Sequence, residues 1–253
     1  METRLNAGLA EYLIALGDDE LILSHRDSEW CGHAPILEED IAFANLAVDE
    51  LGHARLWYEL AAELLDEDKE RFPDHLAYFR DASEWRNVQL VSLPNGDWAF
   101  SVLRRYLFDV LEVERLRGLK QSSYKPLAEA AAKIYNEELY HVRHGRAWLP
   151  RLGLGTEESH RRMQTALNDL WPFTPQLFQA LPGESELSGV VPTTPGLEAE
   201  WRTKVVADLA SANLNPPEKS NPMNRPRTQQ TEHMMDLLSE SQMVARANVE
   251  ARW

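Results

Sequence analysis

The sequence predicts an all-α fold, with a four-helix bundle as its core and additional helices and long loops around it. Apolar residues recur every three or four positions along most of the 253 residues, which is the period of an amphipathic helix. Strands are not expected, because the best alternating segment, residues 188–192, is too short. Two Glu-x-x-His motifs lie inside the helical pattern, and such pairs are typical of metal-binding four-helix bundles.

Eight helices are predicted, and turn-forming residues separate them. Their ranges are 3–27, 36–66, 76–91, 97–120, 124–151, 157–180, 195–210 and 229–248. A Gly-His-Ala-Pro segment at 32–35 separates the first two helices. An Asn-Gly turn precedes the fourth, for which Asp97 is the expected N-cap, and Thr156 begins the sixth after a Gly-Leu-Gly segment.

We expect one domain that spans residues 1–253. At this length and with 43% hydrophobic residues, the chain can bury a sizeable core. Segments rich in Pro, Gly, Ser and Asn predict long loops near 181–194 and 213–228, and the C-terminal helix at about 229–248 follows them.

Composition narrows the possible partners and the compartment. The net charge of −15 disfavours nucleic acid and anionic membranes, because phosphate binding needs a basic surface. The one cysteine, Cys31, excludes an intrachain disulfide and indicates a reducing environment. The N-terminus lacks the pattern of a signal peptide, and no apolar run approaches the ~18 residues that span a bilayer. We therefore expect a cytoplasmic protein with neither a nucleic-acid nor a membrane partner.

The two motifs, Glu50-x-x-His53 and Glu138-x-x-His141, lie on the apolar faces of two helices. Residues three apart share a helix face, so each motif can present a carboxylate and an imidazole to one point. The first stripe reads Phe43, Leu46, Glu50, His53, Trp57, Leu60 and Leu64. The second reads Leu127, Ala131, Ile134, Glu138, His141, Gly145, Trp148 and Leu152. Both motifs are therefore predicted to face the core.

Two other apolar stripes are each interrupted by one acid, Glu20 on the first predicted helix and Asp109 on the fourth. Burial of unpaired carboxylates is costly, so four of them on core stripes need compensation. A pair of metal ions supplies it, and the expected metal ligands are Glu20, Glu50, His53, Asp109, Glu138 and His141. Glu112 is the alternative to Asp109 on the fourth helix.

A metal-free core is the competing interpretation. Buried acid–histidine and acid–arginine networks can hold a bundle together, and Arg55, Arg104, Arg105 and Arg143 are available as partners. In that case the acids should have pKa values raised by burial and mutual repulsion. His25, His33 and His144 are expected to have structural or surface roles, and His144 could alternatively support a ligand from outside. Cys31 is expected to be a packed small residue rather than a nucleophile.

Segments spread over the whole chain resemble the C-subunit (PaaC) family of bacterial phenylacetyl-CoA 1,2-epoxidase complexes, which is a ferritin-like family. The matching segments are Leu16-Gly-Asp-Asp-Glu-Leu-Ile-Leu-Ser-His-Arg26, Glu29-Trp-Cys-Gly-His-Ala-Pro35, Ala47-Val-Asp-Glu-Leu-Gly-His-Ala-Arg55, Leu93-Pro-Asn-Gly96, Leu107-Phe-Asp-Val110, Tyr140-His-Val-Arg143, Trp171-Pro-Phe-Thr174, Thr231-Glu-His233 and Trp253. No one segment is diagnostic, but their order and spacing together are specific.

The resemblance implies a ferritin-like bundle and a place in a multicomponent oxygenase of aerobic phenylacetate catabolism. It implies that a related catalytic (PaaA-like) subunit holds the di-iron centre, that this chain pairs with it as a non-catalytic partner, and that other subunits and a flavin and iron–sulfur reductase complete the complex. Members of the C branch often lack a complete ligand set. This sequence departs from that pattern, because the six residues named above match the metal-carrying positions of the catalytic relative.

Two classes of function therefore remain open. The chain is either a structural subunit with a retained site or itself a di-iron carboxylate oxygenase. An active oxygenase needs an apolar pocket that reaches the metals, whereas a structural subunit can fill that volume with Trp57, Tyr106 or Tyr140. An iron store or peroxide scavenger is a third possibility, but the long loops and the C-terminal helix exceed a minimal bundle. A homo-oligomer is also compatible with the sequence.

Overall fold

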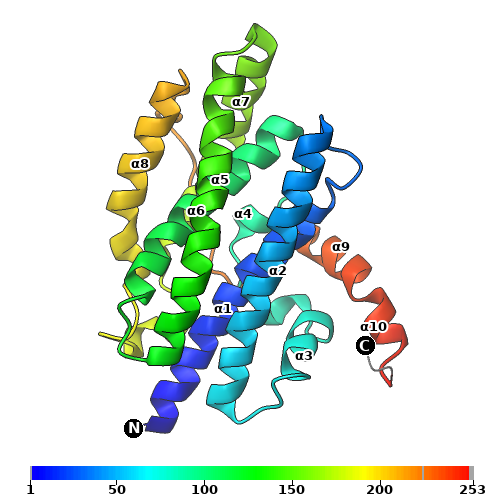
Figure 1. The fold of residues 1–253 in the computed structure, drawn as a ribbon, viewed down its shortest axis with the longest axis vertical. Coiled ribbons are helices and arrows are strands. Elements are labelled where there is room, and N and C mark those ends of the chain that lie inside the picture. The colour runs from blue at the N-terminus through cyan, green and yellow to red at the C-terminus, as the bar shows by residue number, and fades with distance from the viewer. Residues whose placement is uncertain (1, 224, 251–253) are drawn as a thin grey trace.

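The computed structural model describes residues 2–223 and 225–250, and the described chain is all-α, as predicted (Figure 1). The α-helices are α1 (Glu2–Ser28), α2 (Leu37–Leu65), α3 (Phe72–Tyr78), α4 (Gln89–Ser92), α5 (Trp98–Leu119), α6 (Lys125–Gly153), α7 (Glu157–Leu170), α8 (Glu198–Ser211), α9 (Glu232–Ser241) and α10 (Met243–Ala247). Short 3₁₀ helices are η1 (Ala82–Glu84), η2 (Trp171–Phe178), η3 (Glu184–Glu186) and η4 (Thr194–Leu197). These residues include no strand, and an isolated bridge joins Ser188 and Val191. None of the described helices is long and apolar enough to cross a membrane.

The four long helices α1, α2, α5 and α6 form the bundle. Short loops, residues 29–36 and 120–124, join α1 to α2 and α5 to α6, so each pair is an antiparallel hairpin (Figure 1). The longer segment 66–97, which contains α3, η1 and α4, crosses from the first hairpin to the second. One long crossover between two helix hairpins is the connectivity of ferritin-like bundles.

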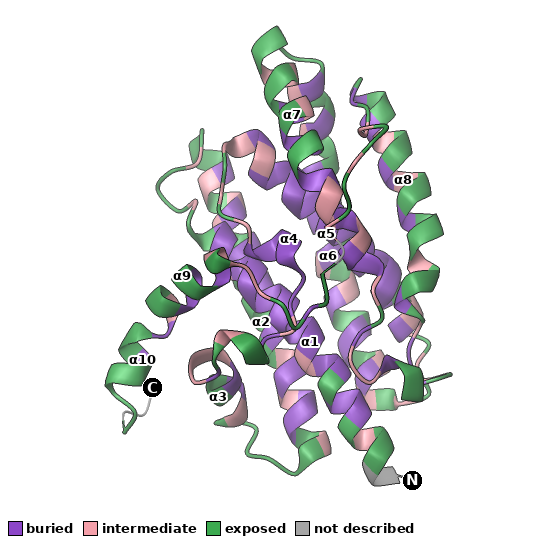
Figure 2. Cartoon of the chain, turned by 180° about the vertical axis from the view of Figure 1, so that it is seen from behind, coloured by how far each residue is buried: buried purple, intermediate pink, exposed green. Residues whose placement is uncertain are grey.

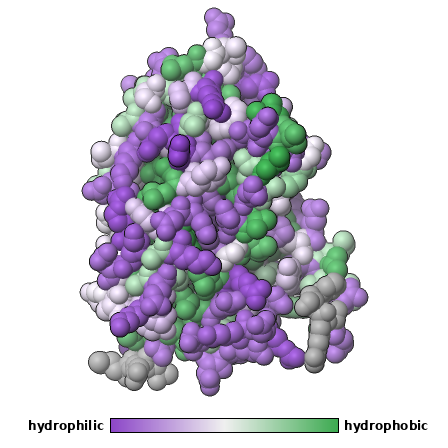
Figure 3. Space-filling view, in the orientation of Figure 1, coloured by the Kyte–Doolittle hydropathy of each residue, from purple (hydrophilic) through white to green (hydrophobic). Residues whose placement is uncertain are grey.

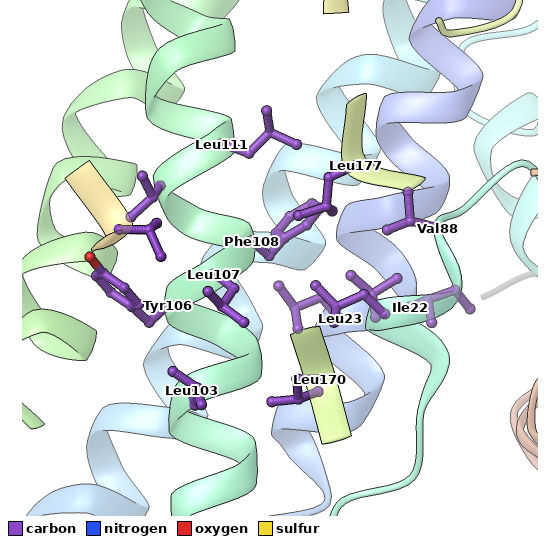
Figure 4. Close-up of a cluster of buried hydrophobic side chains, with 14 of the residues drawn as sticks. Ile22, Leu23, Val88, Leu103, Tyr106, Leu107, Phe108, Leu111, Leu170 and Leu177 are labelled. Atoms are coloured by element: carbon purple, nitrogen blue, oxygen red, sulfur yellow. The ribbon is translucent and has the colours of Figure 1, made fainter. Parts of the chain in front are cut away.

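Helix α5 is the most deeply buried of the four. The sequence predicts one apolar stripe on this helix, but the structure buries its other faces too, because α7 and α8 pack against it in addition to α6. Figure 2 shows buried residues along α5 and exposed residues on the outer faces of α8, α9 and α10. Leu103, Leu107, Phe108 and Leu111 of α5 lie in one apolar cluster with residues of α1, α7 and η2 (Figure 4). The indole of Trp201 on α8 donates a hydrogen bond of 2.8 Å to the carbonyl oxygen of Leu107.

The helix predicted at 76–91 is wrong. Helix α3 ends at Tyr78, and the chain then runs in extended and 3₁₀ segments over α1. Two buried acids of α1 explain the difference. Asp18 accepts hydrogen bonds from the Arg80 guanidinium and from the backbone N–H of Arg86 (2.8 Å), and Asp19 accepts one from the N–H of Val88 (2.7 Å). These bonds use backbone donors that a continuous helix would need.

Two further predicted helices are shorter than expected. The helix predicted at 157–180 ends at Leu170 and continues as η2, because Pro172 and Pro175 lack the backbone N–H that an α-helix requires. The C-terminal helix divides at Gln242, whose side-chain amide donates 3.1 Å hydrogen bonds to the carbonyl oxygens of residues 77 and 80. The predicted N-cap Asp97 is confirmed, since its carboxylate accepts a 3.0 Å hydrogen bond from the N–H of Phe100.

A close contact fixes the relative position of α1 and α2. A Cβ atom on Gly17 would lie 2.4 Å from the ring of Tyr58, so only glycine lets this ring lie against the backbone of α1. The Tyr58 hydroxyl donates a 2.7 Å hydrogen bond to Asp18. Glu20 lies about one turn after Gly17 on α1. The contact between Gly17 and Tyr58 therefore also fixes the position of Glu20 along α2.

We expect Asp18→Ala to destabilise the protein by about 3–5 kcal/mol, because the substitution leaves the guanidinium of Arg80 buried without its carboxylate. The free energy of unfolding in urea measures this loss. Glu158→Ala is the control, since it removes a carboxylate from exposed pairs with Arg161 and Arg162 and should leave that free energy unchanged. Equal stability of both variants would contradict the structural role of the Asp18–Arg80 pair.

Candidate metal centre

The six side chains predicted as ligands come together in the middle of the bundle, and each is at least 98% buried. They come from all four core helices: Glu20 from α1, Glu50 and His53 from α2, Asp109 from α5, and Glu138 and His141 from α6. Their role as ligands stays a prediction.

The six residues form two overlapping groups of four. Glu20, Glu50, His53 and Glu138 can each place one ligand atom within 4.8 Å of the others, and so can Glu50, Asp109, Glu138 and His141. We call these groups the first and the second position. Both groups include Glu50 and Glu138, so these two carboxylates lie between the positions, as bridging ligands of two metals would.

Each histidine directs Nδ1 towards the shared carboxylates. His53 Nδ1 lies 3.7 Å from Glu50 Oε2 and 3.5 Å from Glu138 Oε1. His141 Nδ1 lies 3.0 Å from Glu138 Oε1 and 3.3 Å from Glu50 Oε1. The arrangement therefore follows from two helical i, i+3 pairs that face each other across the bundle.

Two more carboxylates, which the sequence patterns did not single out, hold the outer nitrogens of the histidines. His53 Nε2 lies 2.7 Å from Glu137 Oε2 on α6, and His141 Nε2 lies 3.3 Å from Asp49 Oδ2 on α2. A carboxylate behind a ligating histidine fixes the ring and its tautomer. A signal was present in the sequence, since an acid directly precedes the glutamate of each motif, in Asp49-Glu50 and in Glu137-Glu138.

Arg105 of α5 enters the second position. Its Nη2 contacts Glu50 Oε1 and lies 2.8 Å from His141 Nδ1, and its Nε lies 3.4 Å from Asp109 Oδ2. Its Nη1 is paired with the buried carboxylate of Asp27. The sequence indicated Arg105 only as a possible partner in a metal-free core. A signal was present in the sequence, because Arg105 precedes Asp109 by four residues and therefore shares its face of the helix.

The pKa values describe how the cluster distributes its charge without a metal. Burial and the nearby Glu50 carboxylate raise the pKa of Glu20 well above its usual value, and burial does the same for the pKa of Asp109 against the opposing effect of Arg105. Burial alone would raise the pKa of Glu50, but Arg105 and the neighbouring hydrogen bonds hold it well below its usual value. The expectation of raised values is thus confirmed for Glu20 and Asp109 and is wrong for Glu50.

The pKa values of Glu138, His53 and His141 also reflect burial opposed by the charges of their neighbours. Burial would also raise the pKa of Glu138, but His141 lowers it, so the expectation is wrong here too. Burial lowers the pKa of His53, but its contacts with Glu138 and Glu50 outweigh this effect and raise it to about 10. For His141, burial and Arg105 oppose protonation, and the Glu138 and Asp49 carboxylates raise its pKa well above the usual value. The metal-free cluster therefore holds protons where a metal would provide positive charge.

Four buried atoms without a hydrogen-bond partner show whether the residues of the cluster suit a metal. Glu20 Oε2, Glu50 Oε2, His53 Nδ1 and Glu138 Oε2 all lack a conventional hydrogen-bond partner. All four belong to the first position, which shares Glu50 and Glu138 with the second. Both carboxylate oxygens of Asp109 in the second position also lack a hydrogen-bond partner, but the charged Nε of Arg105 lies 3.4 Å from Oδ2. Three carboxylates and one imidazole are a donor set that divalent Mn, Fe and Zn accept. The first position therefore fits a divalent cation.

Other candidates from the sequence lie outside the cluster. Glu112, the alternative to Asp109, pairs with Arg115, and burial, partly opposed by Arg115, raises its pKa to about 7. His144 Nε2 lies 2.8 Å from Glu39 Oε2 rather than behind a ligand. The expectation that Cys31 is packed is wrong, because this residue is exposed in the segment between α1 and α2, where it lines a surface groove together with His25.

Two cavities of the described chain lie away from the cluster. One, of about 420 Å³, is lined by α5 and α7 residues such as Phe100 and Arg162. The other, of about 320 Å³, is the groove between α1, α2, α3 and α9. Of the three aromatic residues proposed to fill a pocket, Trp57 and Tyr106 are fully buried and Tyr140 is exposed. The Tyr106 hydroxyl donates to Asp208 on α8, so only Trp57 is left as a candidate for that role.

Comparison with known families decides the relationship of the chain. The family model described as "Phenylacetic acid catabolic protein" matches residues 1–253. The chain belongs to this family. The C subunit of 1,2-phenylacetyl-CoA epoxidase from Escherichia coli (strain K12) is 40% identical over 248 residues, which cover 97% of this chain and 99% of the relative. The A subunit of that epoxidase is 28% identical over 145 residues, 57% of this chain and 45% of the relative. The resemblance to the C-subunit family is thereby confirmed.

The pairing of His53 with Glu137 leads to a prediction for metal affinity. We expect Glu137→Gln to weaken the binding of Mn²⁺ by about 10- to 100-fold, because the histidine loses the carboxylate that orients it. Competition with a chromophoric chelator measures the affinity. Glu129→Gln, which removes an exposed carboxylate from the same helix, is the matched control and should bind like the unchanged chain. The same loss in both variants would rule out a specific role for Glu137.

Proposed function

We propose that the chain is the structural, non-catalytic C subunit of a multicomponent phenylacetyl-CoA 1,2-epoxidase and pairs with a catalytic A subunit in aerobic phenylacetate catabolism. The observation that carries the proposal is the match to the C subunit of the Escherichia coli epoxidase, which extends over nearly the full length of both chains. The A subunit of that epoxidase is a more distant relative of the same chain, so the two proposed partners share an ancestry. Further subunits and a reductase complete the proposed complex, which is expected to work in the cytoplasm.

The surroundings of the cluster support a partner role rather than catalysis. An aromatic acyl-CoA ring needs an apolar cavity that leads to the reacting centre. Two cavities of the described chain are lined by other residues and cannot serve this purpose, and Trp57 occupies the core one turn beyond His53. The positive charge of Arg105 also stands inside the cluster, where it contacts three of the candidate ligands.

A di-iron oxygenase is the second candidate, and the convergence of all six candidate ligands favours it. In that case Glu20 and His53 would hold one iron, Asp109 and His141 the other, and Glu50 and Glu138 would bridge them. Such a pair of irons supplies the oxygen activation of a ring oxygenase. The chain itself would contribute the buried, water-excluding core around the pair and the orientation of the histidines by Glu137 and Asp49.

An exposed apolar face on α2 is the proposed contact surface for the catalytic partner. Leu37, Ile41, Val48 and Leu51 recur on one side of this helix and are 49–72% exposed. Figure 3 shows apolar patches over α2 within a largely hydrophilic face. The 320 Å³ groove runs beside the same residues and can receive a side chain of the partner. Contiguous exposed apolar surface of this kind is characteristic of protein interfaces.

Purified alone with iron and the reductase, the chain should not convert phenylacetyl-CoA, because Trp57 fills the core beside the cluster and the Arg105 guanidinium stands within it. Product analysis by chromatography measures conversion, and the same mixture supplemented with the catalytic subunit is the positive control. Turnover by this chain alone, abolished by Glu50→Ala, would overturn the structural role and establish the oxygenase.

Val48→Lys should disrupt association with the catalytic subunit, because a partner would bury the charge without compensation. We expect an affinity loss of at least about tenfold in a co-purification or titration assay. The variant should fold normally, since Val48 is 67% exposed. Leu154→Lys, which charges an exposed leucine beyond the end of α6, is the control and should leave association intact. Unchanged affinity of Val48→Lys would place the contact elsewhere.

A further inference from the structure

We propose that the cluster binds a single divalent cation, in the first position, and that the guanidinium of Arg105 permanently takes the place of the second cation. This inference goes beyond the partner role. It rests on the cluster alone, so failure of the chain to associate with a catalytic subunit would leave it standing.

The contacts of Arg105 fall on one side of the cluster. Three of the four members of the second position, Glu50, Asp109 and His141, contact its guanidinium nitrogens. The oxygen of Glu50 that faces Arg105 is Oε1, whereas Oε2 faces His53 and the first position. Glu50 thus presents one oxygen to the arginine and keeps the other for a cation.

Arg105 is held in this place from behind. Its Nη1 pairs with Asp27, which is fully buried, and the other oxygen of Asp27 lies 3.7 Å from the guanidinium of Arg104. If Arg105 moved out of the cluster, Asp27 would lose its closest positive partner in the core. The arginine is therefore a fixed part of the cluster and not a mobile side chain that a metal could displace at little cost.

A second cation would meet this fixed charge at close range. Metals bridged by two shared carboxylates lie about 3.5–4 Å apart, and the second would coordinate through His141 Nδ1. Arg105 Nη2 is 2.8 Å from that nitrogen. Like charges at such distances repel strongly in a buried site, where water does not screen them. The second position therefore excludes a metal while Arg105 is present.

The carboxylate oxygens of Asp109 in the second position also lack a hydrogen-bond partner, but Arg105 already places its charge 3.4 Å from Oδ2. The first position differs because the guanidinium of Arg105 lies on the other side of the cluster. Glu20, Glu50, His53 and Glu138 each contribute a buried donor atom without a conventional hydrogen-bond partner. Within the part of the chain that the structure describes, no guanidinium pairs with Glu20 or hydrogen-bonds to His53, and Glu137 supports His53 from outside at 2.7 Å. A divalent cation would satisfy all four atoms at once, with the guanidinium of Arg105 supplying the neighbouring positive charge.

The first test counts bound metal. The full-length chain, titrated with Mn²⁺ alone under anaerobic conditions and separated from free metal, should contain one manganese per chain. Arg105→Gln removes the charge and keeps a polar side chain, and it should bind two. Arg104→Gln is the matched control, because it removes the adjacent buried guanidinium that does not reach the cluster, and it should still bind one. Two manganese ions in the unchanged chain, or none, would overturn the proposal, as would one in Arg105→Gln.

Electron paramagnetic resonance adds a readout that does not depend on stoichiometry. The unchanged chain should show the full intensity of isolated Mn²⁺, whereas a bridged pair in Arg105→Gln should lose intensity through coupling between the ions. Coupled manganese in the unchanged chain would contradict a single-cation site.

A second pair of variants keeps the proposal testable if Arg105→Gln does not fold. Glu20→Gln alters the first position only and should weaken Mn²⁺ binding by about tenfold or more, because a carboxylate ligand becomes a neutral amide. Asp109→Asn alters the second position only and should leave the affinity within about twofold. The reverse order of effects would place the cation at the second position and refute the role of Arg105.

Discussion

The need to compensate buried carboxylates is the constraint on which the rest of this structure depends. A carboxylate in a bundle core requires a cation, a proton or a metal nearby. Several of the buried acids pair with arginines: Asp18 with Arg80, Asp19 with Arg227, Asp27 with Arg104 and Arg105, and Glu112 with Arg115. These pairs also anchor the segments outside the bundle, since Arg80 belongs to the crossover and Arg227 to the loop before α9. Charge compensation thus arranges both the site and its surroundings.

The side chains of the cluster have an approximate two-fold symmetry, and Arg105 breaks it. Helices α2 and α6 each carry an acid, a glutamate and a histidine in the same order, and each histidine pairs with the acid of the opposite helix. On this symmetry alone the two metal positions would be equivalent. Arg105 comes from α5 and contacts only one side, so it makes the positions chemically different. A single basic residue can in this way leave the ligands of a two-metal centre in place and still prevent one of the two metals from binding.

Local sequence patterns were sufficient where helices are long and face one core. The ends of α1, α2, α5 and α6 lie within two residues of the predicted bounds, and all six candidate ligands were found from the phase of their acids and histidines on apolar stripes. Prediction failed where tertiary contacts override local preference. The segment 79–88 has helical composition but bonds to the acids of α1 instead. The spacing of four from Asp109 puts Arg105 on the same face of α5, but its contacts with Asp27 of α1 and Glu50 of α2 depend on how the helices pack, which the local pattern does not give.

The short loops at 29–36 and 120–124 have a consequence for the order in which the protein folds. Each joins two helices that are neighbours in sequence, and contacts between such neighbours form faster than contacts between distant segments. The first hairpin alone assembles Glu20, Glu50 and His53, and the second assembles Asp109, Glu138 and His141. Each half carries acids that its own hairpin leaves uncompensated, and Arg105 of the second half neutralises Glu50 of the first. We therefore expect the docking of the two hairpins to be a late folding step, because only then do the buried acids of each hairpin meet the charges of the other.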